Sequence, residues 1–401
     1  MEKIYLISAK RTALGGFLGS LSGVTPANLA ASVAKNILTE TGVSGDSIDE
    51  VIVGNVLSAG QKQGVGRQVA INSGLPVEVT GYSINILCGS GMKAVMNASN
   101  SIKLGDDNLI LAGGTECMAQ APFIQSADTR KGFKMGTFNL QDHILVDGLL
   151  DAFTGIHMGV TAENVALKYG ITRAQQDEFA LNSQKKAIAA IDSGRFKNEI
   201  VPVEAKVGRE TLTIDTDEHP NRKTNLEKLG GLKTVFKKDG SVTAGNASGI
   251  NDGAAMLLLA SEKAVKEYNL TPIAEVISYD QAGVDPEIMG IGPVPAINKA
   301  LKKAGLSLQD IDLIELNEAF AAQSIGVIKG LAETNDVSEE FILERTNVNG
   351  GAIALGHPIG ASGARIIVTL VHEMKKRNSQ YGLASLCIGG GMGTAFILKN
   401  L

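Results

Sequence analysis

The chain of 401 residues contains only three cysteines, and they lack the regular spacing of a disulfide framework. This excludes the small secreted proteins whose folds depend on disulfides, and it favours a reducing compartment. The longest apolar run, Ala254–Ala260, has seven residues, whereas a membrane-spanning helix needs about 20. The first residues, Met1–Ser8, predict a β-strand rather than an export signal. We therefore expect a soluble, cytoplasmic protein with no membrane partner.

Excess basic charge is also lacking, because 37 Lys and Arg residues face 42 Asp and Glu residues and give a net charge of −5. Nucleic-acid-binding domains usually carry a basic surface, so no nucleic acid is expected as a partner. No cysteine and histidine pair has the spacing of metal ligands, and no metal is expected. The 47 glycines are abundant without a collagen-like period, which indicates many tight turns.

Three features of the first half of the chain recur in the same order in the second half. They are a turn followed by a strand, a Ser-Gly pair before a helix, and a strand that ends in glycines. The matching segments are 42–52 and 305–315, Ser90-Gly91 and Ser362-Gly363, and 109–114 and 386–390. The repeat predicts an α/β protein of two similar halves, with mostly parallel sheets covered by helices on both faces.

The region between the halves has a different pattern, with predicted helices over 159–169 and 173–193. We expect residues 1–116, together with about 244–270, to form the first half and 271–401 to form the second. Residues 117–243 are then an inserted loop subdomain. In such folds, sites collect at the carboxyl ends of strands, where the glycine-rich turns of this chain also lie.

Cys88 stands in a glycine-rich turn directly before a predicted helix, whose apolar face includes Met92, Val95, Met96 and Ile102. A helix N-terminus favours a thiolate and lowers the pKa of a cysteine. Most cysteines in such a chain are instead small buried apolar residues that serve packing. Taken alone, the position leaves both interpretations open.

Four separate segments combine glycine-rich turns with a reactive or polar side chain. They are Asn85–Met92, Asn317–Phe320, Gly356–Gly363 and Cys387–Gly393, with the sequences NILCGSGM, NEAF, GHPIGASG and CIGGGMG. In this order they resemble the thiolase family, and most closely its short-chain members that act on acetoacetyl-CoA. The resemblance covers essentially the whole chain. It implies a thiolase fold, with two duplicated βαβαβαββ-type halves in a layered α-β-α-β-α core.

The resemblance also implies roles for five residues. Cys88 is expected to take an acyl group from one acyl-CoA, and His357 to take the proton from Cys88. Cys387 would remove a proton from the α-carbon of the second acyl-CoA, a task suited to a thiol of pKa near 8. The backbone N–H groups of Cys88 and Gly389 would stabilise one oxyanion. The other would be stabilised by His357 and by Asn317, which would act through a water molecule. Without the resemblance, a buried cysteine, a structural histidine and a helix-capping asparagine are the simpler interpretations.

Seven further residues are expected to bind the acyl group or CoA. His157 and Met158 would narrow the acyl cavity, and Ser248 would hydrogen-bond the pantetheine. Arg222 is a candidate for the CoA phosphates, as are Lys223, Lys237 and Lys238. The remaining three are Phe236, Ala247 and Phe320. Each of these residues could instead serve packing, turn formation or solvation. No cofactor is expected beyond the substrate CoA.

The expected reaction is reversible condensation of two acetyl-CoA into acetoacetyl-CoA and CoA, by ping-pong kinetics through S-acetyl-Cys88. A broad-specificity 3-ketoacyl-CoA thiolase of fatty-acid degradation is the alternative within the family, and His157-Met158 together with 131–153 favours the first. A non-catalytic acyl-CoA binder and a redox switch between Cys88 and Cys387 are two alternatives of other classes. The resemblance further implies a homodimer or homotetramer, with Phe123–Asp147 as the loop that pairs dimers.

Overall fold

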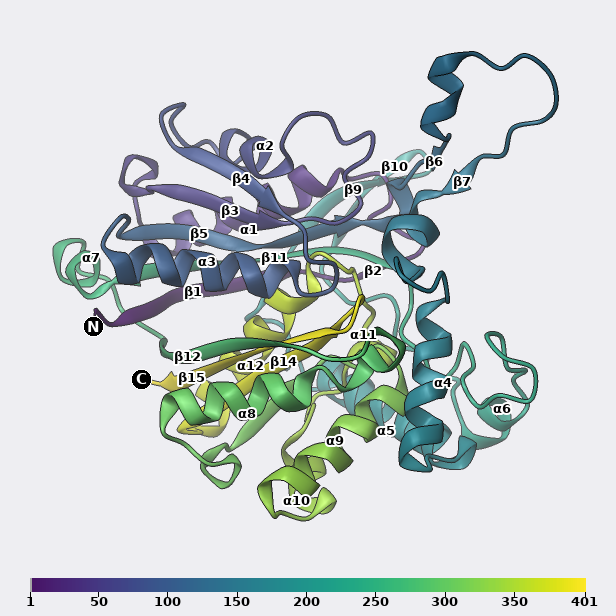
Figure 1. Ribbon diagram of the computed structural model, residues 1–401. Coiled ribbons are helices and arrows are strands. Elements are labelled where there is room, and N and C mark those ends of the chain that lie inside the picture. Colours follow the sequence, from purple (N-terminus) through teal and green to yellow (C-terminus); the bar gives the residue numbers. More distant parts are fainter. Residues whose placement is uncertain (1) are drawn as a thin grey trace.

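A computed structural model describes residues 2–401, and Met1 of the predicted strand Met1–Ser8 lies outside them. Nine strands follow one continuous path across the central sheet (Figure 1). In order they are β13 (Leu313–Leu316), β14 (Tyr381–Ile388), β15 (Met392–Asn400), β12 (Ala274–Gly283), β1 (Ile4–Thr12), β11 (Asn251–Ser261), β5 (Leu109–Cys117), β3 (Glu50–Gly54) and β4 (Thr80–Ile84). The two halves meet where β1 pairs with β12 through only Tyr5–Glu275 and Leu6–Ala274.

The internal repeat is confirmed strand by strand. The order β3-β5-β11-β1 in the first half corresponds to β13-β14-β15-β12 in the second, with the same pattern of parallel and antiparallel pairs. The prediction of mostly parallel sheets was wrong. Only the β3–β4, β3–β5 and β13–β14 pairs of the path are parallel. In the second half, a short glycine turn joins β14 directly to β15, and so short a turn permits only an antiparallel pair.

Helices form three layers around the strands (Figure 1). The inner helices, α3 (Ser90–Leu104) and α12 (Ser362–Arg377), share one apolar core with strands of both halves. The outer face of the first half is covered by α1 (Pro26–Thr41) and α2 (Val65–Asn72), and that of the second by α8 (Pro293–Ala304) and α9 (Ala321–Asn335). This arrangement agrees with the layered α-β-α-β-α core that the resemblance implies.

Glycines allow the inner helices to cross closely at their N-terminal ends. A Cβ atom on Gly363 would lie 2.5 Å from the backbone nitrogen of Met92, and one on Gly91 would lie 2.9 Å from that of Ala364. Any side chain here would force the helices apart. The crossing therefore brings the turn before α3, which carries Cys88, close to the loop before α12, which carries His357.

The region between the halves contains α4 (Met158–Tyr169) and α5 (Arg173–Asp192), which agree with the predicted helices to within one residue at each end. It also contains two hairpins, β6 (Phe123–Ile124) with β7 (Gln141–Asp142) and β9 (Val203–Val207) with β10 (Glu210–Ile214). The segment between β6 and β7 extends away from the body of the molecule (Figure 1).

The remaining strands and α-helices are short: β2 (Gly15–Gly16), β8 (Ile200–Val201), α6 (Leu226–Gly230), α7 (Glu262–Glu267), α10 (Glu339–Arg345) and α11 (Ala352–Leu355). Across residues 2–401, no helix has both the length and the apolar character needed to cross a membrane.

Candidate active site

Cys88 lies in a constrained turn between β4 and α3. Leu87, directly before it, has a φ of 56°, which is uncommon for a residue with a side chain. Hydrogen bonds hold this conformation: Leu87 N–H donates to Asn85 Oδ1 at 2.9 Å, and Ile86 N–H donates to Ser90 Oγ at 3.0 Å. Strained backbone of this kind is typical of functional sites and persists where neighbouring bonds enforce it.

Burial raises the pKa of the Cys88 thiol to about 11, although the backbone N–H groups of Gly389 and of Cys88 itself act in the opposite direction. The expectation that the helix N-terminus produces a thiolate was therefore wrong, because loss of hydration outweighs the nearby dipoles. Cys88 is a neutral thiol at neutral pH and requires a base. The same two N–H groups point at the sulfur, where an oxyanion formed on an acyl group at Cys88 would also lie.

His357 is held in the loop between α11 and α12. Its backbone N–H donates to Asn251 Oδ1 at 3.0 Å. Its ring Nδ1 lies 2.5 Å from Ser362 Oγ and 3.5 Å from Asn317 Nδ2. Gly356, with a φ of 108°, packs its backbone against the Asn251 side chain. Sequence reasoning missed Asn251, since no short motif marks it.

Burial, together with the positive charge of Arg365 on α12, lowers the pKa of His357 to about 4. The imidazole is therefore neutral at neutral pH. A neutral ring has one nitrogen with a free lone pair, so it can accept a proton.

Cys387 and Asn317 lie at the ends of neighbouring parallel strands. Asn317 follows β13, and its backbone N–H donates to Ser385 O on β14 at 3.0 Å. Burial raises the pKa of the Cys387 thiol, and a charge on nearby Cys88 raises it further. The expected pKa near 8 was therefore wrong, and Cys387 also rests as a neutral thiol.

The turn after β14 connects these groups to the rest of the site. A Cβ atom on Gly389 would lie 3.0 Å from Leu87 Cδ1 and 3.5 Å from Met158 Sδ. Gly389 is thus packed between the Cys88 turn and the start of α4. Cys88, Cys387 and Gly389 lie together, as do Asn317 and His357. The two groups are joined by the bond from Asn317 to β14 and by the packing of Cys88 in the apolar cluster of Ile359, two residues after His357.

Glu116, at the end of β5, joins the loops of the two halves. Its buried carboxylate accepts hydrogen bonds from the backbone N–H groups of Val56 and Leu57, at 3.0 and 3.1 Å, and of Gly360 at 2.9 Å. The Asn55 side chain donates to it at 2.8 Å. Because Gly360 lies three residues after His357, this carboxylate helps to fix the position of the histidine loop. The sequence signal was only an acid two residues after the predicted strand 109–114.

Six of the residues expected to bind substrate gather beside Cys387. The rings of His157 and Phe236 stack at 4.7 Å, and Phe236 meets Phe320 edge-on at 6.1 Å. Ala247 forms an isolated antiparallel β-bridge with Phe320, and Ser248 N–H donates to Ala319 O at 2.9 Å. The apolar cluster that these residues form contains Met158, Ala247, Phe320 and Cys387, with Phe236 packed against it.

The seventh, Arg222, does not join this group. Its guanidinium is more than half exposed and pairs with Asp192 through two hydrogen bonds, of 2.9 and 2.5 Å. Lys223 lines a separate cavity of about 480 Å³ that also includes His219 and Gly245. Lys237 and Lys238 are exposed. Lys237 lines another cavity, of about 430 Å³, with Glu163 and Asp239.

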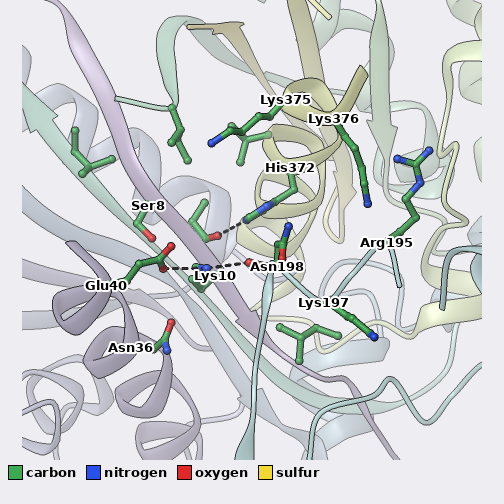
Figure 2. A pocket seen from close by; sticks show the side chains of 15 residues that line it. Ser8, Lys10, Asn36, Glu40, Arg195, Lys197, Asn198, His372, Lys375 and Lys376 are labelled. Atoms are coloured by element: carbon green, nitrogen blue, oxygen red, sulfur yellow. Dashed lines mark hydrogen bonds and ion pairs between the residues drawn. The ribbon is translucent and has the colours of Figure 1, made fainter. Parts of the chain in front are cut away.

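A second basic region lies elsewhere, between β1, α12 and residues 195–200. Figure 2 shows this cavity of about 500 Å³, whose basic lining residues are Lys10, Arg195, Lys197, Lys375 and Lys376, with His372. Lys10 is bound by Glu40 and by the Asn198 carbonyl, and His372 Nε2 donates to Ala9 O. Only the His372 contact joins the two halves, since Glu40 belongs to the first half and Asn198 to the inserted region. None of the five catalytic candidates lines the cavity. Residues 2–401 contain no group of three or more His, Cys, Asp or Glu placed to hold a metal ion.

Family models describe nearly the whole chain. The thiolase N-terminal domain matches residues 4–263, and the thiolase C-terminal domain matches residues 270–400. The chain belongs to the thiolase family. Curated relatives include the acetyl-CoA acetyltransferases of Syntrophomonas wolfei, 53% identical, and Escherichia coli, 51% identical, each covering 100% of both chains.

Two solved structures of this thiolase family have nearly the same fold. Bacillus anthracis acetyl-CoA acetyltransferase has a TM-score of 0.95 and 45% identity, over 100% of this chain and 99% of that one. Human mitochondrial 3-ketoacyl-CoA thiolase in complex with CoA has a TM-score of 0.94 and 45% identity, over 100% and 98%.

The raised pKa of Cys88 predicts how its alkylation depends on pH. Below a pKa of about 11, the thiolate fraction grows about tenfold per pH unit, so the iodoacetamide rate at Cys88 should rise about 100-fold from pH 7 to 9. Mass spectrometry of the Cys88 peptide measures it. In the unfolded chain, as a control, the rise should level off near the ordinary pKa of about 8.5. A plateau below pH 8 in the folded protein would contradict the assignment and indicate a thiolate paired with His357.

Proposed function

We propose that the chain is an acyltransferase, an acetyl-CoA C-acetyltransferase that reversibly condenses two acetyl-CoA into acetoacetyl-CoA and CoA. The observation that carries the proposal is the convergence of two thiols, a neutral histidine and backbone donors from both halves. Full-length relatives about 50% identical that are named acetyl-CoA acetyltransferase support it. We propose no cofactor beyond the substrate CoA.

The first half-reaction transfers acetyl to Cys88. His357 accepts the Cys88 proton, and the thiolate attacks the thioester carbonyl of acetyl-CoA. The oxyanion accepts hydrogen bonds from the backbone N–H groups of Cys88 and Gly389. CoA leaves as a thiolate and takes the Cys387 proton, and the negative charge left on Cys387 is balanced by the positive charge of His357. The enzyme is then S-acetylated at Cys88, with an imidazolium at His357 and a thiolate at Cys387.

The second half-reaction uses that stored pair of charges. The Cys387 thiolate removes a proton from the α-carbon of a second acetyl-CoA, and its raised pKa makes it a stronger base. The enolate oxygen accepts hydrogen bonds from protonated His357 and from a water held by Asn317. The enolate carbon attacks the acetyl group on Cys88, and the released Cys88 thiolate recovers its proton from His357. Both thiols and the imidazole return to their starting forms.

Acyl-chain length is proposed to depend on the apolar cluster beside Cys387. His157, Met158 and Phe236 close this region. Gly159 allows the Phe236 ring to pack against the start of α4, since a Cβ atom on Gly159 would lie 2.3 Å from that ring. We assign Ala247, Ser248 and Phe320 to the pantetheine path. Lys223 and Arg222 are assigned to the phosphate end of CoA, and Arg222 must first release Asp192 to serve there.

The division of roles between the two cysteines predicts distinct variant behaviour. With ¹⁴C-acetyl-CoA, the wild type should carry label on the Cys88 peptide. Cys88→Ser should lose both labelling and condensation. Cys387→Ala should still acquire label, although more slowly, and should condense at least about 10²-fold more slowly because the α-carbon base is missing. Cys117→Ala, a buried cysteine outside the site, is the matched control. Label on the Cys387 peptide would reverse the proposed roles.

The alternative function is that of a broad-specificity 3-ketoacyl-CoA thiolase, and the similarity to the human mitochondrial enzyme of that name is the observation in its favour. We expect the thiolysis kcat/KM for acetoacetyl-CoA to exceed that for 3-ketohexadecanoyl-CoA by at least about tenfold, because each poorly accommodated methylene costs about 1 kcal/mol or more. Coupled assays of both substrates at equal CoA concentration measure the ratio. Comparable values would support the broad-specificity alternative.

We also propose a homotetramer in the cytoplasm. The cytoplasmic assignment is supported by three free cysteines and is checked by cell fractionation. Support for the assembly comes from exposed apolar side chains on the projecting segment, at Phe133, Met135 and Phe138. Changing these three to serine should yield dimers by light scattering, with acyl transfer retained. Serine at Leu104 and Leu167, which are equally exposed elsewhere, should leave the mass unchanged. A wild-type dimer would refute the tetramer.

A further inference from the structure

Ser362, the first residue of α12, is only 1% exposed and has two short contacts through one hydroxyl group. Ser362 Oγ lies 2.5 Å from His357 Nδ1 and 2.8 Å from the carbonyl oxygen of Pro358. A serine hydroxyl has a single hydrogen, so it can donate to only one of these two neighbours. The carbonyl oxygen can only accept, which decides how the hydrogens are shared.

If the hydroxyl donates to Pro358 O, then Nδ1–H of His357 donates to the hydroxyl oxygen, and each short contact contains a hydrogen. If the hydroxyl instead donates to Nδ1, then Ser362 Oγ and Pro358 O face each other at 2.8 Å without a hydrogen, which is repulsive. The amide of Asn317 is 3.5 Å from Nδ1 and makes the weaker contact. The first arrangement is therefore favoured, and it protonates Nδ1.

The other ring nitrogen has different surroundings. His357 Nε2 is buried and has no hydrogen-bond partner within residues 2–401. With Nδ1 protonated, the lone pair of the neutral ring is on Nε2. That nitrogen is the one available to take a proton from a substrate group or from Cys88.

The internal repeat places a second serine in the equivalent position. Ser90 is the first residue of α3, and its hydroxyl donates to Leu87 O at 2.6 Å while accepting from Ile86 N–H at 3.0 Å. In both halves, the first hydroxyl of an inner helix donates to a carbonyl of the preceding turn and accepts an N–H from it. In the first half the bound N–H belongs to the Cys88 turn, whereas in the second it belongs to the imidazole of His357.

We propose that Ser362 is a positioning residue that holds His357 in the Nδ1-protonated tautomer and thereby presents Nε2 as the base toward Cys88. The tautomer follows from the contacts of Ser362 alone. Its kinetic consequence rests on the proposed function, in which His357 takes the Cys88 proton. The two parts are therefore tested by separate measurements.

The tautomer is tested by nuclear magnetic resonance on protein labelled with ¹⁵N-histidine. The chain has only five histidines, and the signals missing from His357→Asn identify those of His357. At pH 7, wild-type His357 should show a protonated Nδ1 and a bare Nε2. Ser362→Ala should show a gain of the Nε2-protonated form. This experiment needs no substrate and does not depend on the reaction.

The kinetic part is tested by quenched-flow acetylation of Cys88. Ser362→Ala should slow acetylation by about 10²-fold or more, the range of a lost general base, with KM for acetyl-CoA within about threefold of wild type. Ser362→Thr retains the hydroxyl and should recover most of the rate. Thr369→Val on the same helix removes another buried hydroxyl, one bound to Glu199, and should leave both tautomer and rate unchanged.

A bare Nδ1 in the wild type overturns the proposal even if Ser362→Ala does not fold. So does a Ser362→Ala protein that keeps Nδ1 protonated and acetylates at the wild-type rate. If the wild type has the expected tautomer but no acetyl group reaches Cys88 from any acyl-CoA, the proposed function fails while the positioning by Ser362 stands.

Discussion

The contact on which the site depends is the close crossing of α3 and α12 at Gly91 and Gly363. Each glycine backbone touches the other helix, so no side chain can separate them. The two helices begin immediately after the loops that carry Cys88 and His357. Their approach thus fixes the distance between groups that are 269 residues apart in sequence, and Glu116 secures the same junction by binding Gly360 across the halves.

Burial at this junction determines the charges of the reactive groups. Desolvation raises the pKa of both thiols and lowers that of His357, so all three are neutral before substrate arrives. In a preformed ion pair, the thiolate would be stabilised by its positively charged partner and would be a weaker nucleophile. In the proposed reaction, these neutral groups become charged only when a thioester is bound, next to backbone donors that need no rearrangement.

Much of the fold and site could be predicted from the sequence, because the repeated turns, the helix periodicity and the four motifs are local patterns. The helices at 158–169 and 173–192 and the convergence of Cys88 with Cys387 were predictable on this basis. Strand direction was not, since antiparallel pairing of β11 and β5 depends on partners distant in sequence. The pKa values depend on the depth of burial, and Asn251 and Glu116 act through contacts across more than 100 and 200 residues.

Duplication explains why a neutral histidine is stable so far from water. The second half adds Arg365 one turn after Ser362, with its guanidinium 3.5 Å from the buried carboxylate of Glu315 on β13. An imidazolium at His357 would be repelled by this positive charge, so the neutral ring is favoured, and it is the form that the proposed transfer from Cys88 requires. The equivalent position of α3 in the first half is Lys93, which is only partly buried and donates to Gln281 Oε1 at 3.0 Å, so its charge remains hydrated. The two halves therefore differ in burial at this position, because only the second places a fully buried cation near its active-site side chain.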